Sequence, residues 1–208
     1  MLLVFSNGVP HFTRMNFRPF LFALSLAACH ILTACNPTFN WREVNLLDDR
    51  AKILMPGKPD ALNRAIVLDT MPVTMAMQGV KINETTFTVA GAALPDKTPA
   101  AADRAIAGMR AQMIRNIAGG AEFIQPGMVR VINDAGKEIA TLAAPRIIVP
   151  GTAQGRPVQM SASFIQYKGY VWQWLVITPV NNKDAKKDNK LSDAAEEFLT
   201  SFRLIDNK

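Results

Sequence analysis

Apolar and polar side chains alternate along two neighbouring segments in the middle of the chain, residues 71–80 and 85–91. One face of the first segment carries Met71, Val73, Met75 and Met77. In the second segment, phenylalanine and valine alternate with threonines. A period of two residues is that of a half-buried β-strand, and the short stretch between the segments suits a hairpin loop. The pattern therefore predicts an antiparallel hairpin with its loop at residues 81–84.

Two segments carry the start and stop signals of helices. Thr98 offers an N-cap hydroxyl and is followed by Pro99, which is favoured in a first helical turn, and Gly119-Gly120 stops the helix near residue 118. Its buried stripe is predicted to consist of Ile106, Met109, Met113 and Ile117. A second helix is predicted to begin at Ser192, just before several acidic residues, and to end near residue 201.

Shorter apolar runs predict the remaining strands. They cover residues 51–55, 64–68, 128–132 and 137–142, and residues 41–44 form a strand or an irregular lead-in. Residues 143–155 contain two prolines and predict no clear element. Runs of strands with one central and one C-terminal helix are typical of the α+β class, in which helices pack on an antiparallel sheet. We therefore expect a single α+β domain over residues 41–208.

The strongest hairpin lies near the C-terminal end, at residues 158–167 and 170–178, joined by Lys168-Gly169. A two-residue loop pairs Tyr167 with Tyr170. One face of the hairpin then carries Ile165, Tyr167, Tyr170, Trp172 and Trp174. The opposite face, which includes Gln173, is assigned to the core. Either a helix covers the aromatic face, or the face is an open groove that binds an acyl chain, a glycan or a partner segment.

The N-terminal segment has the composition of a bacterial targeting signal. Two arginines are the only charged residues before Cys35, and an apolar run follows them. Residues 1–34 are therefore predicted to be a signal peptide, with Met15 as the favoured start. The tetrad Leu-Thr-Ala-Cys at residues 32–35 resembles the lipobox of bacterial lipoproteins, in which the cysteine is lipidated. A second such tetrad ends at Cys29, which is the alternative attachment site.

The resemblance to lipoproteins implies a lipid anchor on Cys35 and a short tether over residues 35–40. In that family an aspartate after the cysteine often retains the protein at the inner membrane, whereas this chain has Asn36. The resemblance therefore implies the outer membrane, with the domain facing the periplasm. A cysteine with several acyl chains is anchored stably, whereas a single chain binds marginally.

Composition excludes several chemistries from the part of the chain after Cys35. Both histidines and both cysteines lie at or before that residue. A Ser-His-Asp triad, a Cys-His nucleophile, structural zinc and haem ligation all need residues that this part lacks. No glycine-rich phosphate loop is present, and no cofactor is predicted. Without the signal, 21 basic and 17 acidic residues remain, spread without a basic block, so nucleic-acid binding is not expected.

Three methionines of the strand at 71–80 are candidate metal ligands. Met71, Met75 and Met77 carry thioethers, which suit Cu(I). No histidine or cysteine is available to complete such a site, and methionine is also a common core filler. The two interpretations are a Cu(I) site and ordinary core packing.

Carboxylates are the remaining candidates for catalysis. Asp48 with Asp49, and Asp69 with Glu84, fall at predicted loops or strand ends. Two acidic side chains that converge in a cleft would suit a carboxylate-based hydrolase. Solvated loop carboxylates are the alternative.

Several segments together resemble a group of uncharacterised proteobacterial lipoproteins. They are NWREV at 40–44, ILMPGKP at 53–59, FTVA at 87–90, LPD at 94–96 and FLTSFRL at 198–204. The layout of that group is similar to the PsbP-like α/β/α sandwich, a central antiparallel sheet with helices on both faces. The resemblance implies that a helix covers the aromatic face of the last hairpin. It provides no catalytic signature, and a shared fold does not define an activity.

These observations favour a non-enzymatic binding or accessory module of an envelope complex, anchored by lipid and contacting an envelope protein. The first alternative is a carrier of a lipid or other apolar ligand. It would use the Trp172/Trp174 face or a cavity lined by Met75, Met77 and Met113. A large internal pocket lined by apolar groups favours the carrier, whereas a solid core favours the accessory module. The second alternative is the carboxylate-based hydrolase.

Overall fold

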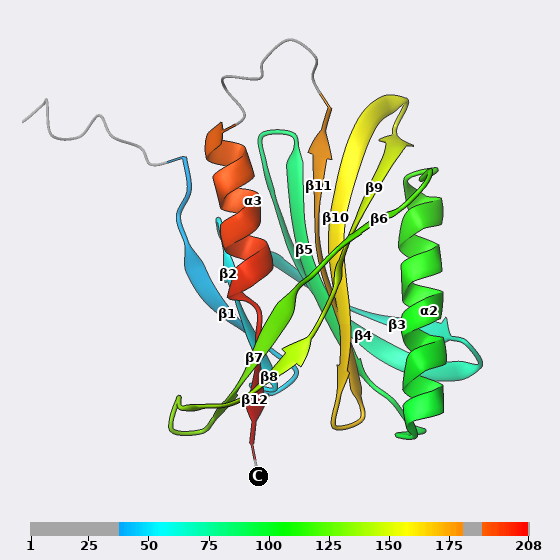
Figure 1. The fold of residues 1–208 in the computed structure, drawn as a ribbon, viewed down its shortest axis with the longest axis vertical. Helices are drawn as coiled ribbons and strands as arrows, with labels where there is room; N and C mark the ends of the chain where they lie inside the picture. Colours follow the sequence, from blue (N-terminus) through cyan, green and yellow to red (C-terminus); the bar gives the residue numbers. More distant parts are fainter. Residues whose placement is uncertain (1–37, 181–188, 208) are drawn as a thin grey trace, which may run out of the picture. The chain divides into compact units, whose positions relative to one another are not determined.

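A seven-stranded antiparallel sheet lies between two covering layers (Figure 1). The computed structural model of the chain describes residues 38–180 and 189–207. The predicted signal peptide, Cys29, Cys35 and the start of the tether therefore lie outside the described residues. Within the described ranges, no helix is long and apolar enough to cross a membrane.

The strand order of the large sheet differs from the order in the sequence. It runs β3 (Asp60–Leu68), β4 (Met71–Ile82), β5 (Thr85–Ala93), β11 (Tyr170–Pro179), β10 (Arg156–Tyr167), β9 (Arg146–Ala153) and β6 (Phe123–Gln125). The most apolar strand, β11, occupies the middle, and most of its residues are buried. Side chains of successive residues point to opposite faces, so each strand contributes to both layers of the core.

A second sheet has five strands. Its order is β1 (Arg42–Leu46), β2 (Ala51–Met55), β12 (Arg203–Asp206), β7 (Met128–Asn133) and β8 (Glu138–Ala143). The C-terminal strand β12 pairs antiparallel with β2 and parallel with β7. It thereby joins two hairpins that are distant in sequence. The single antiparallel sheet expected from the sequence is in fact two sheets.

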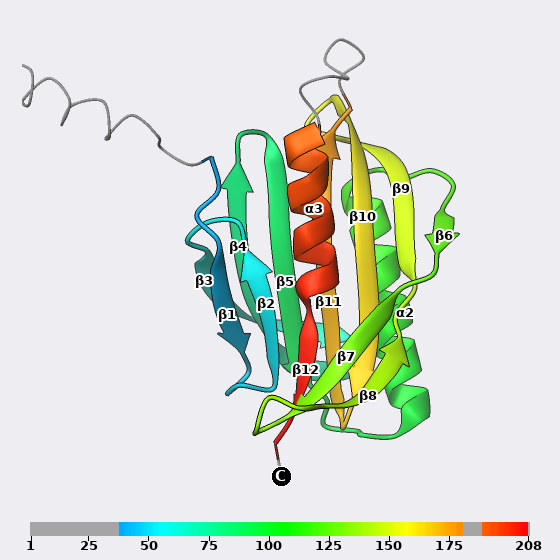
Figure 2. The same cartoon turned by 60° about the vertical axis from the view of Figure 1, so that its left-hand side comes forward.

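The two helices of the described residues lie on opposite faces of the large sheet (Figure 2). α2 (Pro99–Asn116) packs on strands β3, β9, β10 and β11, and α3 (Asn189–Ser201) packs on β2, β5 and β11. The small sheet joins α3 in covering its face, because buried residues of β1, β2, β7 and β12 share one cluster with α3. The fold is therefore mixed α+β with mostly antiparallel sheets, as the sequence predicted.

Local signals predicted several details correctly. The last hairpin has the expected register, with Tyr167 opposite Tyr170 and Ile165 opposite Trp172. The Thr98 hydroxyl caps α2 by accepting a hydrogen bond from the Ala101 amide at 3.3 Å. The Asn133 side chain accepts from the two amides that close the β7–β8 turn. In each case, residues close together in the sequence provide all the groups that form the turn or the helix cap.

Several local predictions are wrong, including the start of β3, which lies at Asp60 and not at residue 64. The loop at 81–84 is only a two-residue turn, in which Asn83 adopts a left-handed φ of 55° that asparagine tolerates. α3 begins before Ser192, at Asn189. Segment 143–155, for which no element was predicted, contains β9. This strand accommodates Pro150 because the Pro150 carbonyl points away from β10 and accepts a hydrogen bond from the Gly120 amide at 2.9 Å. The missing N–H therefore removes no bond to β10.

Candidate functional site

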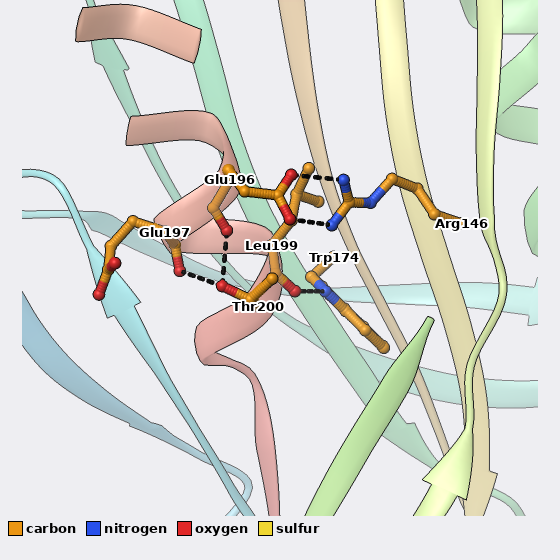
Figure 3. A network of polar contacts seen from close by, with 6 residues as sticks. All are labelled: Arg146, Trp174, Glu196, Glu197, Leu199 and Thr200. Carbon is orange, nitrogen blue, oxygen red and sulfur yellow. Dashed lines mark hydrogen bonds and ion pairs between the residues drawn. The ribbon is translucent and has the colours of Figure 1, made fainter. Parts of the chain in front are cut away.

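The aromatic face of the β10–β11 hairpin is core and not an open groove. Trp172 and Trp174 are only 1% and 2% exposed, under α3 and the small sheet. Trp174 stacks on Phe202 with ring centroids 4.2 Å apart. Its indole N–H donates to the Leu199 carbonyl at 2.9 Å (Figure 3). The groove interpretation is wrong because apolar area of this size is stabilised by burial, and α3 supplies the cover.

The remaining residues of that face lie at or near its rim. Ile165 is buried, whereas Tyr167 and Tyr170 are partly exposed. The Arg50 guanidinium lies 5.6 Å from the centre of the Tyr170 ring. Burial raises the pKa of Tyr167, and the nearby Asp206 carboxylate acts in the same direction. The five predicted residues thus stay together, but they stabilise the fold and form no ligand groove.

The three candidate metal ligands on β4 do not converge. Met71 and Met77 are separated by roughly 20 Å along the extended strand. Met71 and Met75 are buried in the core layer beneath α2. In the described part of the chain, no group of three or more His, Cys, Asp or Glu side chains could hold a metal ion. The three methionines therefore do not form a Cu(I) site, and Met71 and Met75 are core residues. Met75 and Met77 also line a cleft.

The candidate carboxylate pair is separated by the length of β4. Asp69 lies before this 12-residue strand and Glu84 after it, so they are roughly 40 Å apart. Asp69 accepts from Arg104 at 2.9 Å, and Glu84 accepts from Arg156 at 2.7 Å. Each carboxylate is therefore paired with a different arginine, and the two cannot act on one substrate.

The other candidate carboxylates, Asp48 and Asp49, lie together in the β1–β2 turn. Their φ angles are 53° and 62°, in the left-handed region. Asp48 borders an open hollow of about 740 Å³ on the face of β4 that points away from α2. The hollow is open to solvent, and polar and apolar groups contribute about equally to its lining.

A cleft of about 540 Å³ lies between α2 and the β3–β4 hairpin, and we call it the α2 cleft. Its apolar walls are Ile66, Val67, Leu68, Met75, Met77, Met109 and Met113. The three methionines that the sequence indicated for a cavity, at 75, 77 and 113, all line it. Small-molecule sites are typically concave, mostly apolar and about 300–1,000 Å³ in volume. The α2 cleft meets this description.

The cleft follows from the residues on the sheet-facing side of α2. Near the start of the helix, alanines at 101, 102 and 105 are buried, so the helix approaches the sheet closely there. Gly108, farther along, has no side chain to fill the space towards β3. A Cβ atom added at this residue would meet nothing closer than the Asp69 amide nitrogen, at 3.9 Å. The helix therefore leaves a gap beside the hairpin.

Gln173 is a buried polar residue in this apolar cleft. It lies on β11, is 4% exposed and contributes to the cleft lining. Its side-chain nitrogen lies 3.9 Å from the Met113 sulfur, and its Oε1 has no hydrogen-bond partner among the described residues. Leaving a buried acceptor unpaired costs about 1–3 kcal/mol. The alternation along this strand predicted only that Gln173 faces the core, and its polarity between the apolar Val171 and Leu175 is the signal that marks it as a candidate site residue.

Positive charge borders the cleft. Arg64 of β3 and Arg115 of α2 both line it, from opposite walls. The Arg115 guanidinium donates to the Gln112 side-chain oxygen at 2.7 Å. Asp69 also lines the cleft, but it is paired with Arg104. Among the described residues, neither Arg64 nor Arg115 forms an ion pair with a carboxylate.

Glu196 of α3 forms an ion pair with Arg146 of β9 (Figure 3). The guanidinium donates to both carboxylate oxygens, at 2.6 and 3.1 Å, and these bonds lower the pKa of Glu196 below its ordinary value of 4.5. A lowered folded-state pKa stabilises the protein above the ordinary value, and this stabilisation is lost as the pH falls through the folded-state pKa.

Glu196→Gln is therefore expected to have a small, pH-dependent effect. The Glu196 side chain is 57% exposed, so solvent screens the pair and we expect a loss of only about 0.5 kcal/mol in the free energy of unfolding at neutral pH. The difference from wild type should disappear in strong acid. Urea unfolding at neutral pH and near pH 2 measures both values. A difference that persists in acid would show that the substitution acts through packing instead.

Comparison with known proteins identifies no family for this chain, so a functional proposal depends on the geometry of the site. No family model matches the chain, and no curated protein matches it.

Proposed function

We propose that this chain is a lipid-anchored protein of the bacterial envelope whose domain binds a ligand and catalyses no reaction. The lipobox tetrad supports the anchor, on Cys35 with Cys29 as the alternative. Asn36 after the lipobox supports an outer-membrane location facing the periplasm. We also propose that the fold is of the PsbP-like type, which the placement of helices on both faces of the large sheet supports.

The ligand that the geometry supports best is a small apolar molecule in the α2 cleft. One observation carries this proposal: a 540 Å³ cleft lined by seven apolar side chains, four of them methionines. Unbranched thioether side chains adapt their shape to an apolar guest at low cost. The cleft therefore favours the carrier over an accessory module with a solid core.

The accessory role, with an envelope protein as partner, is the second candidate. Three large apolar side chains are strongly exposed near the β6–β7 connection: Phe123 and Ile124 at 64% and Met128 at 61%. Large exposed apolar side chains are candidates for contact with a partner protein. A protein that co-purifies stoichiometrically with wild type, and is lost from Phe123→Ser, would favour this role. Unchanged recovery with Phe123→Ser would count against it.

Filling the cleft from α2 tests the carrier. Gly108→Phe adds a ring to the cleft wall without backbone strain, because space is open at this residue. We expect it to weaken binding of dodecanol by at least about tenfold, which corresponds to about 1.4 kcal/mol. The measurement is titration calorimetry on the full chain held in phosphatidylcholine nanodiscs, with empty nanodiscs subtracted.

Gly108→Ala is the matched control, because it changes the same residue but leaves most of the cleft open. It should bind dodecanol like wild type. Replacing a helical glycine with alanine is also expected to stabilise the protein by about 0.5–1 kcal/mol. Equal affinity of Gly108→Phe and wild type would place the alcohol outside the cleft and refute the proposed site.

Metabolic labelling with a palmitate analogue tests the anchor. Wild type and Cys29→Ser are expected to incorporate the label, whereas Cys35→Ser should lose nearly all of it, because only a cysteine thiol at the cut site accepts the lipid. Label that persists in Cys35→Ser and is lost in Cys29→Ser would move the attachment site to Cys29. Absence of label from all three proteins would refute the lipoprotein proposal.

A further inference from the structure

We infer that the α2 cleft binds a free, single-chain amphiphile with an anionic head group at the cleft mouth and a hydrogen-bond donor on its buried portion. This inference rests on the proposed function, which requires only that the cleft take a small apolar ligand. It adds two polar requirements, one at Gln173 and one at the arginines.

The donor requirement comes from Gln173. Gln173 contributes to the lining of an apolar cleft, and its Oε1 is buried and has no partner among the described residues. The residues paired with Gln173 on the neighbouring strands, Ala90 of β5 and Phe164 of β10, offer no side-chain donor. A ligand hydroxyl or amide N–H would satisfy this oxygen, whereas a plain hydrocarbon would leave it unpaired.

The position of Gln173 makes a purely structural role a poor explanation for its amide. The strand neighbours on the same face, Val171 and Leu175, are apolar and buried. An apolar residue at 173 would avoid the cost of the unpaired oxygen. Within the described residues, the amide forms one side-chain hydrogen bond, from its nitrogen to the Met113 sulfur at 3.9 Å. That bond leaves the buried Oε1 without a donor.

The anionic head group follows from the charges around the cleft. Arg64 and Arg115 approach it from β3 and α2, and no described carboxylate neutralises either one. The one acidic residue of the lining, Asp69, is held by Arg104 at 2.9 Å. Guanidinium groups match carboxylate and phosphate geometry well. A cationic head group would instead meet two uncompensated positive charges.

The size of the cleft indicates that its ligand is one free molecule and not a membrane surface. A volume of about 540 Å³ suits a single small ligand and cannot accept a patch of bilayer. The apolar walls bind the chain, the arginines hold the charged end, and Gln173 recognises a polar group on the buried part. This arrangement selects among amphiphiles by two separate contacts.

Calorimetry with matched probes tests the inference on the full chain in nanodiscs. The probes are dodecanoate, ω-hydroxydodecanoate, dodecanol and dodecylammonium, with carboxylate probes from octanoate to hexadecanoate to find the best chain length. At the best chain length, wild type should bind the ω-hydroxy acid about three- to tenfold more tightly than the acid of the same length without the hydroxyl. It should also bind dodecanoate more tightly than dodecanol, and dodecylammonium most weakly.

Two sets of variants separate the contacts. Gln173→Leu should remove the preference for the hydroxyl while leaving affinity for plain dodecanoate unchanged or slightly improved. Gln173→Met, an unbranched substitute, repeats this test should leucine disturb the strand. Arg64→Gln combined with Arg115→Gln should remove the preference for dodecanoate over dodecanol, and added salt should weaken that preference in wild type.

Failure of the inference and failure of the proposed function give different results. Binding of all probes alike, blocked by Gly108→Phe, would overturn the two polar contacts and leave the apolar carrier standing. A hydroxyl preference that survives in both Gln173 variants would overturn the role of Gln173. No binding by any probe would overturn both proposals.

Discussion

Trp174→Ala is expected to lower the free energy of unfolding by about 3–5 kcal/mol, which is typical of truncating a buried aromatic side chain. Trp174 is 2% exposed and lies between the large sheet and α3. Alanine would remove the stack on Phe202 and leave a cavity. It would also leave the Leu199 carbonyl without the indole N–H that it now accepts at 2.9 Å.

Chemical unfolding monitored by circular dichroism measures this loss. Trp174→Phe keeps a ring against Phe202 but lacks the N–H donor, so we expect a smaller loss of about 1–3 kcal/mol. Trp41→Ala is the surface control, because Trp41 is 36% exposed. A loss in Trp174→Ala no larger than in Trp41→Ala would show that the α3 layer contributes little to stability.

Gly91→Ala is expected to destabilise the protein by about 1–3 kcal/mol through overpacking. Gly91 of β5 lies directly opposite Trp172 in the ladder. A Cβ atom at this residue would overlap Cε3 and Cζ3 of the Trp172 ring. The ring cannot move away freely, because Tyr170 and Phe202 lie against it with centroids 6.1 and 6.0 Å away.

The same substitution at Gly108 provides the comparison. There the added methyl group meets open space within a helix, so stability should rise, whereas at Gly91 it should fall. Thermal unfolding of the two variants side by side measures this difference in sign. Gly91→Ala combined with Trp172→Phe should recover part of the loss, because the smaller ring makes room. Unchanged stability of Gly91→Ala would mean that Trp172 has an alternative position.

Part of the candidate site was predictable from period and turn chemistry. The alternation along β4 places Met75 and Met77 on one face, and the helical period places Met113 on the side of α2 that faces them. The sequence therefore indicated the methionines that line the cleft. Gln173, Gly108 and the two arginines were missed, because each matters only through its distance from a residue on another element.

Interactions among neighbouring residues set the Thr98 cap of α2, the turn at 168–169 and the register of β10 against β11, so these features were predictable from the sequence. The α+β class was predictable as well. Three other features depend on contacts between distant parts of the chain: the position of β12 between β2 and β7 in a second sheet, the burial of Trp172 and Trp174 by α3 and this sheet, and the cleft that α2 leaves beside β3 and β4. Period and turn chemistry act over a few residues, whereas strand partners and helix positions depend on which apolar faces meet across the whole chain.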